Sequence, residues 1–313
     1  MTKVFIDGSA GTTGLRIGER LADRQGLELI RLPAELRKDP DARKEAINSA
    51  DIAFFCLPDA ASVEAAAMVH PDNGHTAVID TSTAHRTDPD WAYGFTELHG
   101  QREKILSSRR IANPGCHASG FISLVEPLVH EGLVSPETAF TCFSVTGYSG
   151  GGKSMIADYE SPARDGALDS PRQYALGQTH KHLKEMVKLC SLETVPVFCP
   201  IVGDYYSGMT VTVPLFRKDL KGSINDVKAL YQACYAGPLV HYEEYDGSLV
   251  AGNALSGRDD MVIMVAGNEE RILLISLFDN LGKGASGAAI QNMKLLLGLD
   301  ETTGLVVGPK SHG

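Results

Sequence analysis

The stretch KVFIDGSAGTTGLRIGERL, residues 3–21, decides the fold of the first part of the chain. An apolar run typical of a strand leads into a loop with Gly8, Gly11 and Gly14, and an amphipathic run typical of a helix follows. The loop is a variant of the G-x-G-x-x-G fingerprint of dinucleotide-binding folds. Its glycines are Gly8, Gly11 and Gly14, and position 9 is Ser. Its place at the start of a strand–helix series favours a nucleotide-binding loop over a purely structural turn.

The alternation of strand and helix patterns continues to about residue 115. The strand-like runs are LELIRL, DIAFFCLP and TAVIDTS, and the helix-like runs between them are DARKEAINSA and DAASVEAAAMV. Short apolar runs separated by helices indicate parallel strands that are covered on both faces. We therefore predict an α/β, Rossmann-like doubly wound parallel sheet.

The pattern changes after Cys116, where longer β-rich runs dominate: AFTCFSVTG, TVPVFCPIV, GMTVTVPLF, DMVIMVAGN and RILLISLFDN. These runs predict an α+β second domain with a largely antiparallel sheet. Near the end, GASGAAIQNMKLLLGL has the period of a helix. We predict a first domain over residues 1–116, completed by a C-terminal helix at residues 282–313, and a second domain over residues 117–281.

Composition narrows the function classes. The formal net charge of -10 over 313 residues argues against a broad nucleic-acid or anionic-membrane surface. No apolar run approaches the ~20 residues that span a bilayer, and the N-terminus carries no secretory signal. None of the six cysteines has C-x-x-C spacing, so no metal site is expected. We expect a cytoplasmic protein with reduced cysteines.

The glycine loop predicts a set of cofactor-binding residues, because a helix N-terminus and close backbone approach suit a pyrophosphate. The set consists of Gly8, Ser9, Ala10, Gly11, Thr12, Thr13 and Gly14. The second strand is followed by Glu35, Arg37 and Lys38. The two cations favour the 2′-phosphate of NADP and Glu35 favours NAD; we expect NADP(H) with Arg37 as a ligand, while an ordinary solvated loop stays open.

Cys116 lies in NPGCHASG, residues 113–120, directly before a helical pattern. The free N–H groups and the dipole at a helix start favour a thiolate, and small neighbours leave the sulfur accessible. Pro127 is expected to kink or end that helix early. A free thiol at a tight turn is the alternative to a nucleophile.

The stretch QTHKHLKE, residues 178–185, offers His180 as an acid–base group, His182 as a polar partner and Glu185 as an orienting acid. An H-x-H pair also ligates metals, but no third ligand is evident.

A further stretch, IDTSTAHR at residues 79–86, follows a strand end, where ligands bind in parallel sheets. Ser82 is expected to touch the cofactor, and Arg86 to clamp an anionic group of the substrate, although a surface ion pair is a serious alternative for Arg86.

The stretch SVTGYSGGGKS, residues 144–154, matches the phosphate-binding loop of ATPases and GTPases in full. The helical pattern after it is short, and the first strand already carries a better-placed glycine loop. A P-loop NTPase is therefore the distant alternative.

Seven motifs together resemble the shorter branch of N-acetyl-γ-glutamyl-phosphate reductases, which are relatives of aspartate-semialdehyde dehydrogenase. They are GSAGTTG, VIDTSTAHR, YGFTEL, ANPGCHAS, SVTGYSGGGK, FCPIVGDYYSGM and DNLGKGASGAAIQNM, in family order from residue 8 to residue 293. One departure is Ser207–Gly208, where longer members have Arg-Gly, so no role passes to Ser207.

The resemblance implies that Cys116 is the nucleophile and His180 the acid–base group in a catalytic and dimerisation domain. It also implies cofactor contacts from Asn280 and Lys283, and substrate contacts from Arg86, Tyr148, His182 and Glu185. Cys116 would attack an acyl phosphate, and the thioester would be reduced to an aldehyde with NADPH. A homodimer or homotetramer is implied as well.

Two alternatives to this reductase interpretation and the roles of two residues stay open at this stage. The substrate can be an aspartyl- or aminoadipyl-type acyl phosphate. A non-enzymatic NAD(P)-binding regulator would bind cofactor without an activated thiol. The roles of Tyr148 and Lys153 are not fixed by the sequence.

Overall fold

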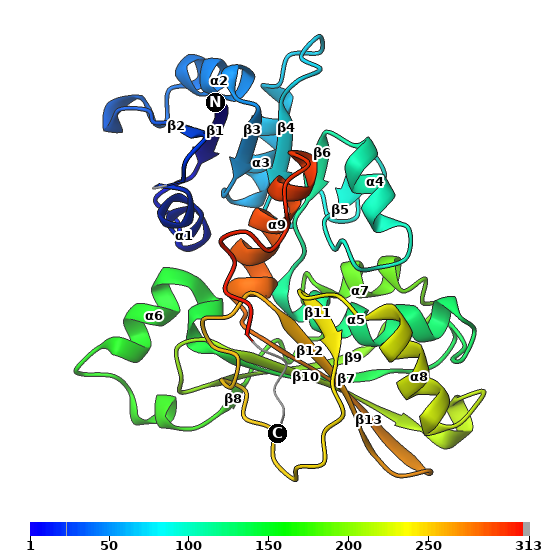
Figure 1. Cartoon of the computed structure of the whole chain (residues 1–313). Helices are drawn as coiled ribbons and strands as arrows, with labels where there is room; N and C mark the ends of the chain where they lie inside the picture. The colour runs from blue at the N-terminus through cyan, green and yellow to red at the C-terminus, as the bar shows by residue number, and fades with distance from the viewer. Residues whose placement is uncertain (23, 309–313) are drawn as a thin grey trace. The chain divides into compact units, whose positions relative to one another are not determined.

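The computed structural model describes residues 1–22 and 24–308, and these fall into two compact units (Figure 1). The first unit contains Met1–Thr96, Gly100–Pro114 and Ala285–Gly304. The second contains Glu97–His99, Gly115–Gly284 and the described residues from Leu305 onward.

The first unit is built on a parallel sheet with helices around it. Its described strands are β1 Thr2–Asp7, β2 Leu27–Ile30, β3 Ile52–Phe55, β4 Ala77–Asp80, β5 Ala92–Tyr93 and β6 Arg110–Ala112. Its helices are α1 Thr12–Leu21, α2 Pro40–Ser49, α3 Asp59–Ala67, α4 Gln101–Ser107, α9 Gly287–Leu296 and the 3-10 turn η1 Ala34–Leu36. The strand order is β2-β1-β3-β4-β6-β5, and each neighbouring pair is parallel.

The central strands of this sheet are buried along their whole length, as their uninterrupted apolar runs predict. Every residue of β3 and of β4 is buried. Two core side chains, Phe54 and Phe55, point to opposite faces, because successive residues of a strand alternate. Layers on both faces are thereby required, and the doubly wound prediction is confirmed.

The second unit is built on a mixed, mostly antiparallel sheet. Its described strands are β7 Thr141–Gly147, β8 Arg172–Gln173, β9 Val197–Gly203, β10 Met209–Phe216, β11 Val240–Tyr242, β12 Met261–Gly267 and β13 Arg271–Phe278. Its helices are α5 Cys116–His130, α6 Gly152–Glu160, α7 Leu183–Leu189 and α8 Ile224–Cys234. The 3-10 turns are η2 Tyr148–Gly151, η3 Gly166–Asp169 and η4 Arg217–Asp219. The strand order is β11-β12-β13-β10-β7-β9-β8, and β7/β9 and β11/β12 are the parallel pairs.

Helix α5 packs on one face of this sheet at very short range. A methyl group on Gly120 would lie 2.4 Å from Val211 of β10 and 2.9 Å from the Ser276 hydroxyl of β13. Figure 1 shows α7 and α8 beside α5 on the same side of the sheet. The odd-numbered residues of β10, such as Val211, face these helices and are buried, whereas Thr210 and Thr212 are only half-buried.

The prediction that Pro127 ends helix α5 early is wrong, since the helix continues to His130. A proline leaves the carbonyl four residues earlier without its helical partner. Here the Tyr235 hydroxyl donates to that carbonyl, Ser123 O, at 2.7 Å, and the Tyr231 hydroxyl donates to Leu124 O. Tertiary hydrogen bonds next to α8 thus replace the one that proline removes.

The C-terminal helix is shorter than predicted. A π-helical turn, η5 Gly282–Ser286, leads into α9, which ends at Leu296. Gly298 follows with a φ of 66°, the left-handed conformation that terminates helices. Residues 297–308 contain turns and irregular backbone, and residues 309–313 of the predicted helix lie outside the described residues.

No helix in the described part of the chain has both the length and the apolar character needed to cross a membrane.

Candidate active site

The glycine loop after β1 has the tight geometry of a nucleotide-binding turn. Gly8 has a φ of 84°, and a Cβ there would lie 2.2 Å from the Cys56 carbonyl oxygen. A Cβ on Gly14 would lie 2.5 Å from Gly8 O and 3.1 Å from Cys56 Cβ. These two glycines therefore let the loop and helix α1 approach β3 closely.

The third glycine is less crowded, and its amide donates to Gly8 O at 3.0 Å. Gly11 precedes α1 as its N-cap with ordinary extended backbone, and a Cβ there would meet only carbonyl oxygens at 3.4 Å or more. No side chain caps the helix, and Thr12 and Thr13 form its first turn. Amide groups and the positive end of the helix dipole are thus available to an anion, which is what a pyrophosphate requires.

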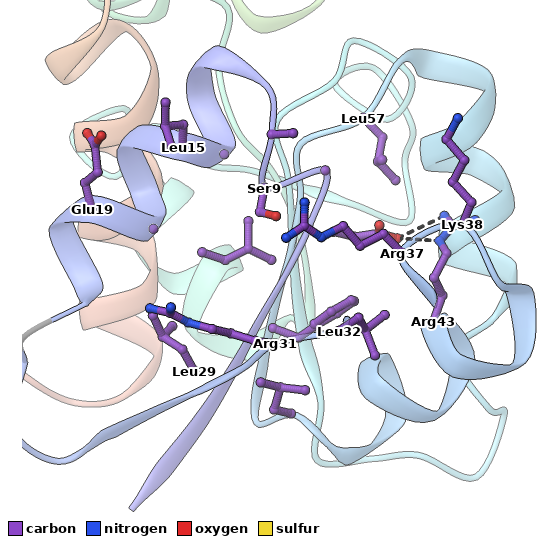
Figure 2. A pocket seen from close by; sticks show the side chains of 18 of the residues that line it. Ser9, Leu15, Glu19, Leu29, Arg31, Leu32, Arg37, Lys38, Arg43 and Leu57 are labelled. Atoms are coloured by element: carbon purple, nitrogen blue, oxygen red, sulfur yellow. Dashed lines mark hydrogen bonds and ion pairs between the residues drawn. The ribbon is translucent and has the colours of Figure 1, made fainter. Parts of the chain in front are cut away.

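A cavity of about 810 Å³ lies beside this loop within the first unit (Figure 2). Its walls include Gly8, Ser9, Ala10 and Gly14 from the loop and Leu29–Leu32 from the end of β2. Most of the lining is apolar, as suits an adenine ring, and the size fits a cofactor.

Cations gather on the cavity wall where a ribose is expected, after the second strand. Arg31, Arg37 and Lys38 line it, and Figure 2 shows their side chains around the cavity. None of the three has an ion-pair partner among the described residues, whereas Glu35 lies in η1 and does not belong to the lining. Arg31 was not predicted, because β2 ends at Ile30, two residues earlier than the apolar run suggests.

A fourth cation of the cavity, Arg43, is already paired. Its guanidinium contacts the Asp7 carboxylate at 2.9 and 3.0 Å and Glu64 at 3.4 Å. Burial raises the pKa of Asp7, and the hydrogen bond from Arg43 lowers it in part. We assign Arg43 to the framework of the cavity.

The residues predicted at the end of β4 are held by a buried carboxylate. Asp80 accepts hydrogen bonds from the Ser82 amide at 2.9 Å and hydroxyl at 2.8 Å, and its Oδ2 lies 2.6 Å from His85 Nδ1. Arg86 is buried, and its guanidinium donates to the carbonyls of Asn113 and Thr81 at 2.8 and 2.9 Å. A cofactor contact of Ser82 and an anion contact of Arg86 stay predictions, and the structure shows that both side chains brace the backbone.

Cys116 is the first residue of α5, in the second unit, and its side chain is half-buried. Gly115 precedes it as an N-cap without a side-chain cap. The buried Glu185 carboxylate accepts the Gly115 amide at 3.0 Å, which holds the turn that carries the cysteine. A Cβ on Gly284 would lie 2.9 Å from Cys116 Cβ, so the segment after β13 packs directly against the cysteine.

Three histidines gather beside the start of α5. The ring of His117 lies 5.7 Å from that of His180 and 5.6 Å from that of His182, centroid to centroid. His182 Nε2 lies 4.0 Å from Glu185 Oε1. The structure therefore brings together the predicted His180, His182 and Glu185 at the residue that follows Cys116.

His117 belongs to this cluster but was not predicted. Its Nδ1 lies 2.6 Å from the Ser144 hydroxyl, and its Nε2 lies 2.7 Å from the Tyr174 hydroxyl. Burial first, and His180 second, lower its pKa to about 3, so the imidazole is neutral at pH 7. Its position next to the cysteine is the sequence signal that points to it.

His180 is half-buried, and its pKa is lowered by burial and by Lys181. The loop before it is tightly held, because the Gln178 side chain forms a pair of hydrogen bonds with the backbone of Phe198 at 2.7 and 2.9 Å. Gln178 and Ala175 have φ values of 54° and 53°, a conformation that costs non-glycine residues energy. A fixed, neutral imidazole suits an acid–base role.

The other predicted residues of the second unit have mainly structural contacts. Tyr148 stacks on Tyr159 at 4.7 Å in a small apolar cluster. Asn280 accepts the Gly208 amide at 2.9 Å and donates to the Ser149 hydroxyl at 3.0 Å. The buried Lys283 ammonium contacts Glu97 at 2.7 and 2.8 Å. Substrate contact by Tyr148 and cofactor contacts by Asn280 and Lys283 stay predictions.

The phosphate-loop sequence does not form a phosphate cradle. Its amides are occupied: Gly147, Tyr148 and Ser149 donate to backbone carbonyls at residues 208, 205 and 206 over 2.9–3.0 Å. The Gly152 amide donates to Ser149 O within the turn η2. A triphosphate needs these N–H groups free, so the geometry contradicts the NTPase alternative.

A parallel nucleotide-binding sheet in one unit and a mixed, mostly antiparallel sheet in the other define the class of two-domain dehydrogenases. Family models agree with this class: residues 10–107 match "Semialdehyde dehydrogenase, NAD binding domain" and residues 116–280 match "Semialdehyde dehydrogenase, dimerisation domain".

Relatives narrow the class further. An N-acetyl-gamma-glutamyl-phosphate reductase from Brucella ovis is 45% identical over 307 residues, which cover 95% of this chain and 99% of the relative. Two solved aspartate-semialdehyde dehydrogenases share the fold. The form II enzyme from Vibrio cholerae has a TM-score of 0.69 at 17% identity and covers 95% of this chain and 98% of its own. The enzyme from Candida albicans, solved with NADP, has a TM-score of 0.67 at 16% identity with the same coverage.

The chain belongs to the semialdehyde dehydrogenase family, and within it to the N-acetyl-γ-glutamyl-phosphate reductases.

Proposed function

We propose that the protein reduces N-acetyl-γ-glutamyl phosphate to N-acetylglutamate semialdehyde with release of phosphate, a step of arginine biosynthesis. The observation that carries this proposal is Cys116 at the first position of α5, half-buried and beside a histidine cluster in which burial lowers the pKa of His117 and His180. The 45% identity to reductases named for this substrate supports the choice among acyl phosphates.

Cys116 acts as the nucleophile in this scheme. Its sulfur attacks the acyl carbon, the carbon–oxygen bond to phosphate breaks, and a thioester forms on the enzyme. The N-terminal position on α5 favours the thiolate, because the positive end of the helix dipole stabilises negative charge there. Backbone N–H groups at this helix start are suited to the oxyanion of each tetrahedral intermediate.

His180 handles the protons. Its neutral imidazole accepts the thiol proton before attack and returns a proton to the oxygen that forms during reduction. As the hemithioacetal collapses, His180 takes the proton of that oxygen back, the C–S bond breaks, the thiolate is restored, and the aldehyde leaves. Such proton transfer contributes roughly 10²–10⁴-fold to the rate.

Glu185 positions the nucleophile, in addition to the substrate contact that stays a prediction for it. Its carboxylate accepts the Gly115 amide at 3.0 Å and lies near His182, so one buried anion fixes both the cysteine turn and a neighbouring histidine. Removing the charge would loosen the turn, since hydrogen bonds to charged groups are worth about 1.5–3 kcal/mol.

The cavity of the first unit suits NADP(H) as the cofactor. The nicotinamide supplies the hydride when the cofactor is bound. The helix start after Gly11 would hold the pyrophosphate. Arg31, Arg37 and Lys38 would hold a 2′-phosphate, because all three line the wall without an ion-pair partner among residues 1–22 and 24–308, and Glu35 does not line it. The C. albicans relative, solved with NADP, supports the same choice.

A homodimer or homotetramer formed through the second unit completes the proposal. Apolar side chains are exposed on the sheet face opposite α5: Phe143 at 43%, Val197 at 52% and Leu273 at 38%. The matching dimerisation-domain model covers these strands. All six cysteines are free, in keeping with a reducing, cytoplasmic location.

Steady-state assays test the reaction. The purified protein is expected to oxidise NADPH and release one phosphate per turnover with N-acetyl-γ-glutamyl phosphate, and to do so far more slowly with β-aspartyl phosphate. Equal or better activity with the aspartyl compound would move the protein to the aspartate-semialdehyde dehydrogenase type. NADPH binding without turnover of any acyl phosphate would instead indicate a regulator.

A further inference from the structure

A cluster of metal-ligating side chains lies at the other end of helix α5, outside the site described above. Its members are His99, Glu126, His130 and Glu131, all in the second unit, and we call them the α5 C-terminal cluster. Cys116 and His130 are the first and last residues of α5, so the cluster is about 20 Å along the helix from the nucleophile. The proposed reaction does not use it.

The donor atoms of this cluster are close enough to share an ion. His99 Nε2 lies 3.7 Å from Glu131 Oε1, and His130 Nδ1 lies 3.0 Å from the same oxygen. Zinc binds imidazole nitrogen and carboxylate oxygen at about 2.0–2.2 Å, which places neighbouring donors about 3.3–3.5 Å apart in a tetrahedral site. The two observed separations bracket that spacing.

A contact with Glu126 sets the orientation of the His99 ring for metal binding. The His99 Nδ1 lies 3.1 and 3.2 Å from the two oxygens of Glu126, whose side chain is 10% exposed. A carboxylate that accepts the Nδ1–H of a histidine fixes the tautomer that leaves the Nε2 lone pair for a metal. The carboxylate–histidine arrangement of many metal sites is therefore already formed.

The electrostatic field at the cluster favours a cation. Two carboxylates, Glu126 and Glu131, stand at the C-terminal end of α5, where the helix dipole is negative. Their charge reaches the Cys234 thiol, whose pKa is raised by burial and then by both carboxylates. A divalent ion would offset this excess negative charge.

One feature of the cluster must change when an ion binds. The rings of His99 and His130 are stacked, 3.8 Å apart and within 9° of parallel. A metal lies in the plane of each imidazole that binds it, and two stacked planes do not meet. His130 must therefore rotate out of the stack, which its 51% exposed side chain can do, since only Glu131 holds it among the described residues.

We propose that His99 Nε2, His130 and Glu131 bind a divalent transition-metal ion of the zinc class, with Glu126 positioning His99. The two imidazoles favour zinc, cobalt or nickel over magnesium or calcium, which prefer all-oxygen sites. The bound ion would join the segment Glu97–His99 to the end of α5 and so stabilise the second unit. A sequence search misses the site, because His99 precedes its partners by 27 residues or more.

Cobalt(II) titration of the metal-free full-length protein tests this site. All variants carry Cys116→Ser, so that the nucleophile does not compete. One equivalent of Co²⁺ is expected to bind with weak visible bands and without the intense near-ultraviolet band of a thiolate ligand. His130→Ala should abolish this binding, and Glu126→Gln should weaken it about 10–100-fold. His75→Ala, which removes an exposed histidine in the first unit, is the matched control and should bind as the parent does.

A stability measurement gives the second readout. Zn²⁺ should raise the melting temperature of the parent and of His75→Ala but not of His130→Ala, whose exposed position leaves the fold intact. Cobalt affinity that is unchanged by His130→Ala would overturn the proposal, as would a thiolate band or no binding at all. In the last case the contact between His99 and Glu126 is a structural hydrogen bond.

Discussion

Two loops of this protein share a strand, a run of glycines and a helix start, yet their backbones differ in what they leave free. Both helix starts lack a side-chain cap, but the loop at Gly8–Gly14 borders a cavity. In the loop at Gly147–Gly152, three amides donate to backbone carbonyls of residues 205, 206 and 208, and the Gly152 amide donates within the 3-10 turn. A glycine motif therefore predicts an anion site only where the N–H groups have no partner within the protein.

The largest expected effect separates the glycines of the two loops. Gly8→Ala should destabilise the protein by about 2–5 kcal/mol, because the left-handed penalty of about 1–2 kcal/mol adds to overpacking of about 1–3 kcal/mol against Cys56. Gly152→Ala has nothing within 4 Å to overpack, but its φ of 70° and ψ of -164° lie in a region that almost only glycine adopts, so a backbone penalty of about 1–3 kcal/mol applies alone. Denaturant unfolding of both variants measures the difference. Equal losses would show that the loop after β1 is not packed as described.

A substitution in the cavity beside the first loop should weaken cofactor binding, whereas a substitution in the second loop should not change it. Arg37→Ala is expected to raise the KM for NADPH about 10–100-fold, since a charged hydrogen bond is worth about 1.5–3 kcal/mol, and to leave the KM for NADH nearly unchanged. Lys153→Ala is the control: it should alter neither value, and neither form should bind ATP. An ATP turnover that disappears with Lys153→Ala would restore the phosphate-loop interpretation.

The chemistry of the second unit should depend on the turn before α5 rather than on its glycine loop. Glu185→Gln keeps a hydrogen-bond acceptor for the Gly115 amide but removes the charge, and we expect kcat to fall about tenfold with little change in KM. Asp158→Asn, on the exposed face of α6, should have no effect. If both substitutions leave kcat unchanged, Glu185 has no positioning role.

The smallest effect concerns pH. Burial and Lys181 lower the pKa of His180, so its neutral, basic form persists below pH 6.5, and the acid limb of kcat/KM should have its midpoint below that value. Lys181→Gln removes one cause, which should raise the pKa and move the limb to higher pH by a fraction of a unit. The exposed Lys184→Gln should leave the profile in place. A limb that moves to lower pH with Lys181→Gln would exclude His180 as the titrating group.

The sequence predicts what short-range patterns determine. Uninterrupted apolar runs gave the parallel sheet, and the Pro-Gly turn before a helical period placed Cys116 at the start of α5. Contacts between distant segments were not predictable. Tyr231 and Tyr235 support the proline of α5 from more than a hundred residues away, and His117 joins Ser144 and Tyr174 only in the folded chain. The hydrogen bonding of the second glycine loop was equally unpredictable, because the carbonyls that accept its amides come about sixty residues later in the chain.

The most direct test of the account is the intact mass of the protein after mixing with N-acetyl-γ-glutamyl phosphate in the absence of cofactor. The covalent mechanism predicts an acyl adduct that peptide mapping places on Cys116. NADPH should release this acyl group as the aldehyde, and Cys116→Ser should not form the adduct. The covalent mechanism would be contradicted if the wild-type protein turns over the substrate but shows no adduct. An adduct on a residue other than Cys116 would contradict it as well.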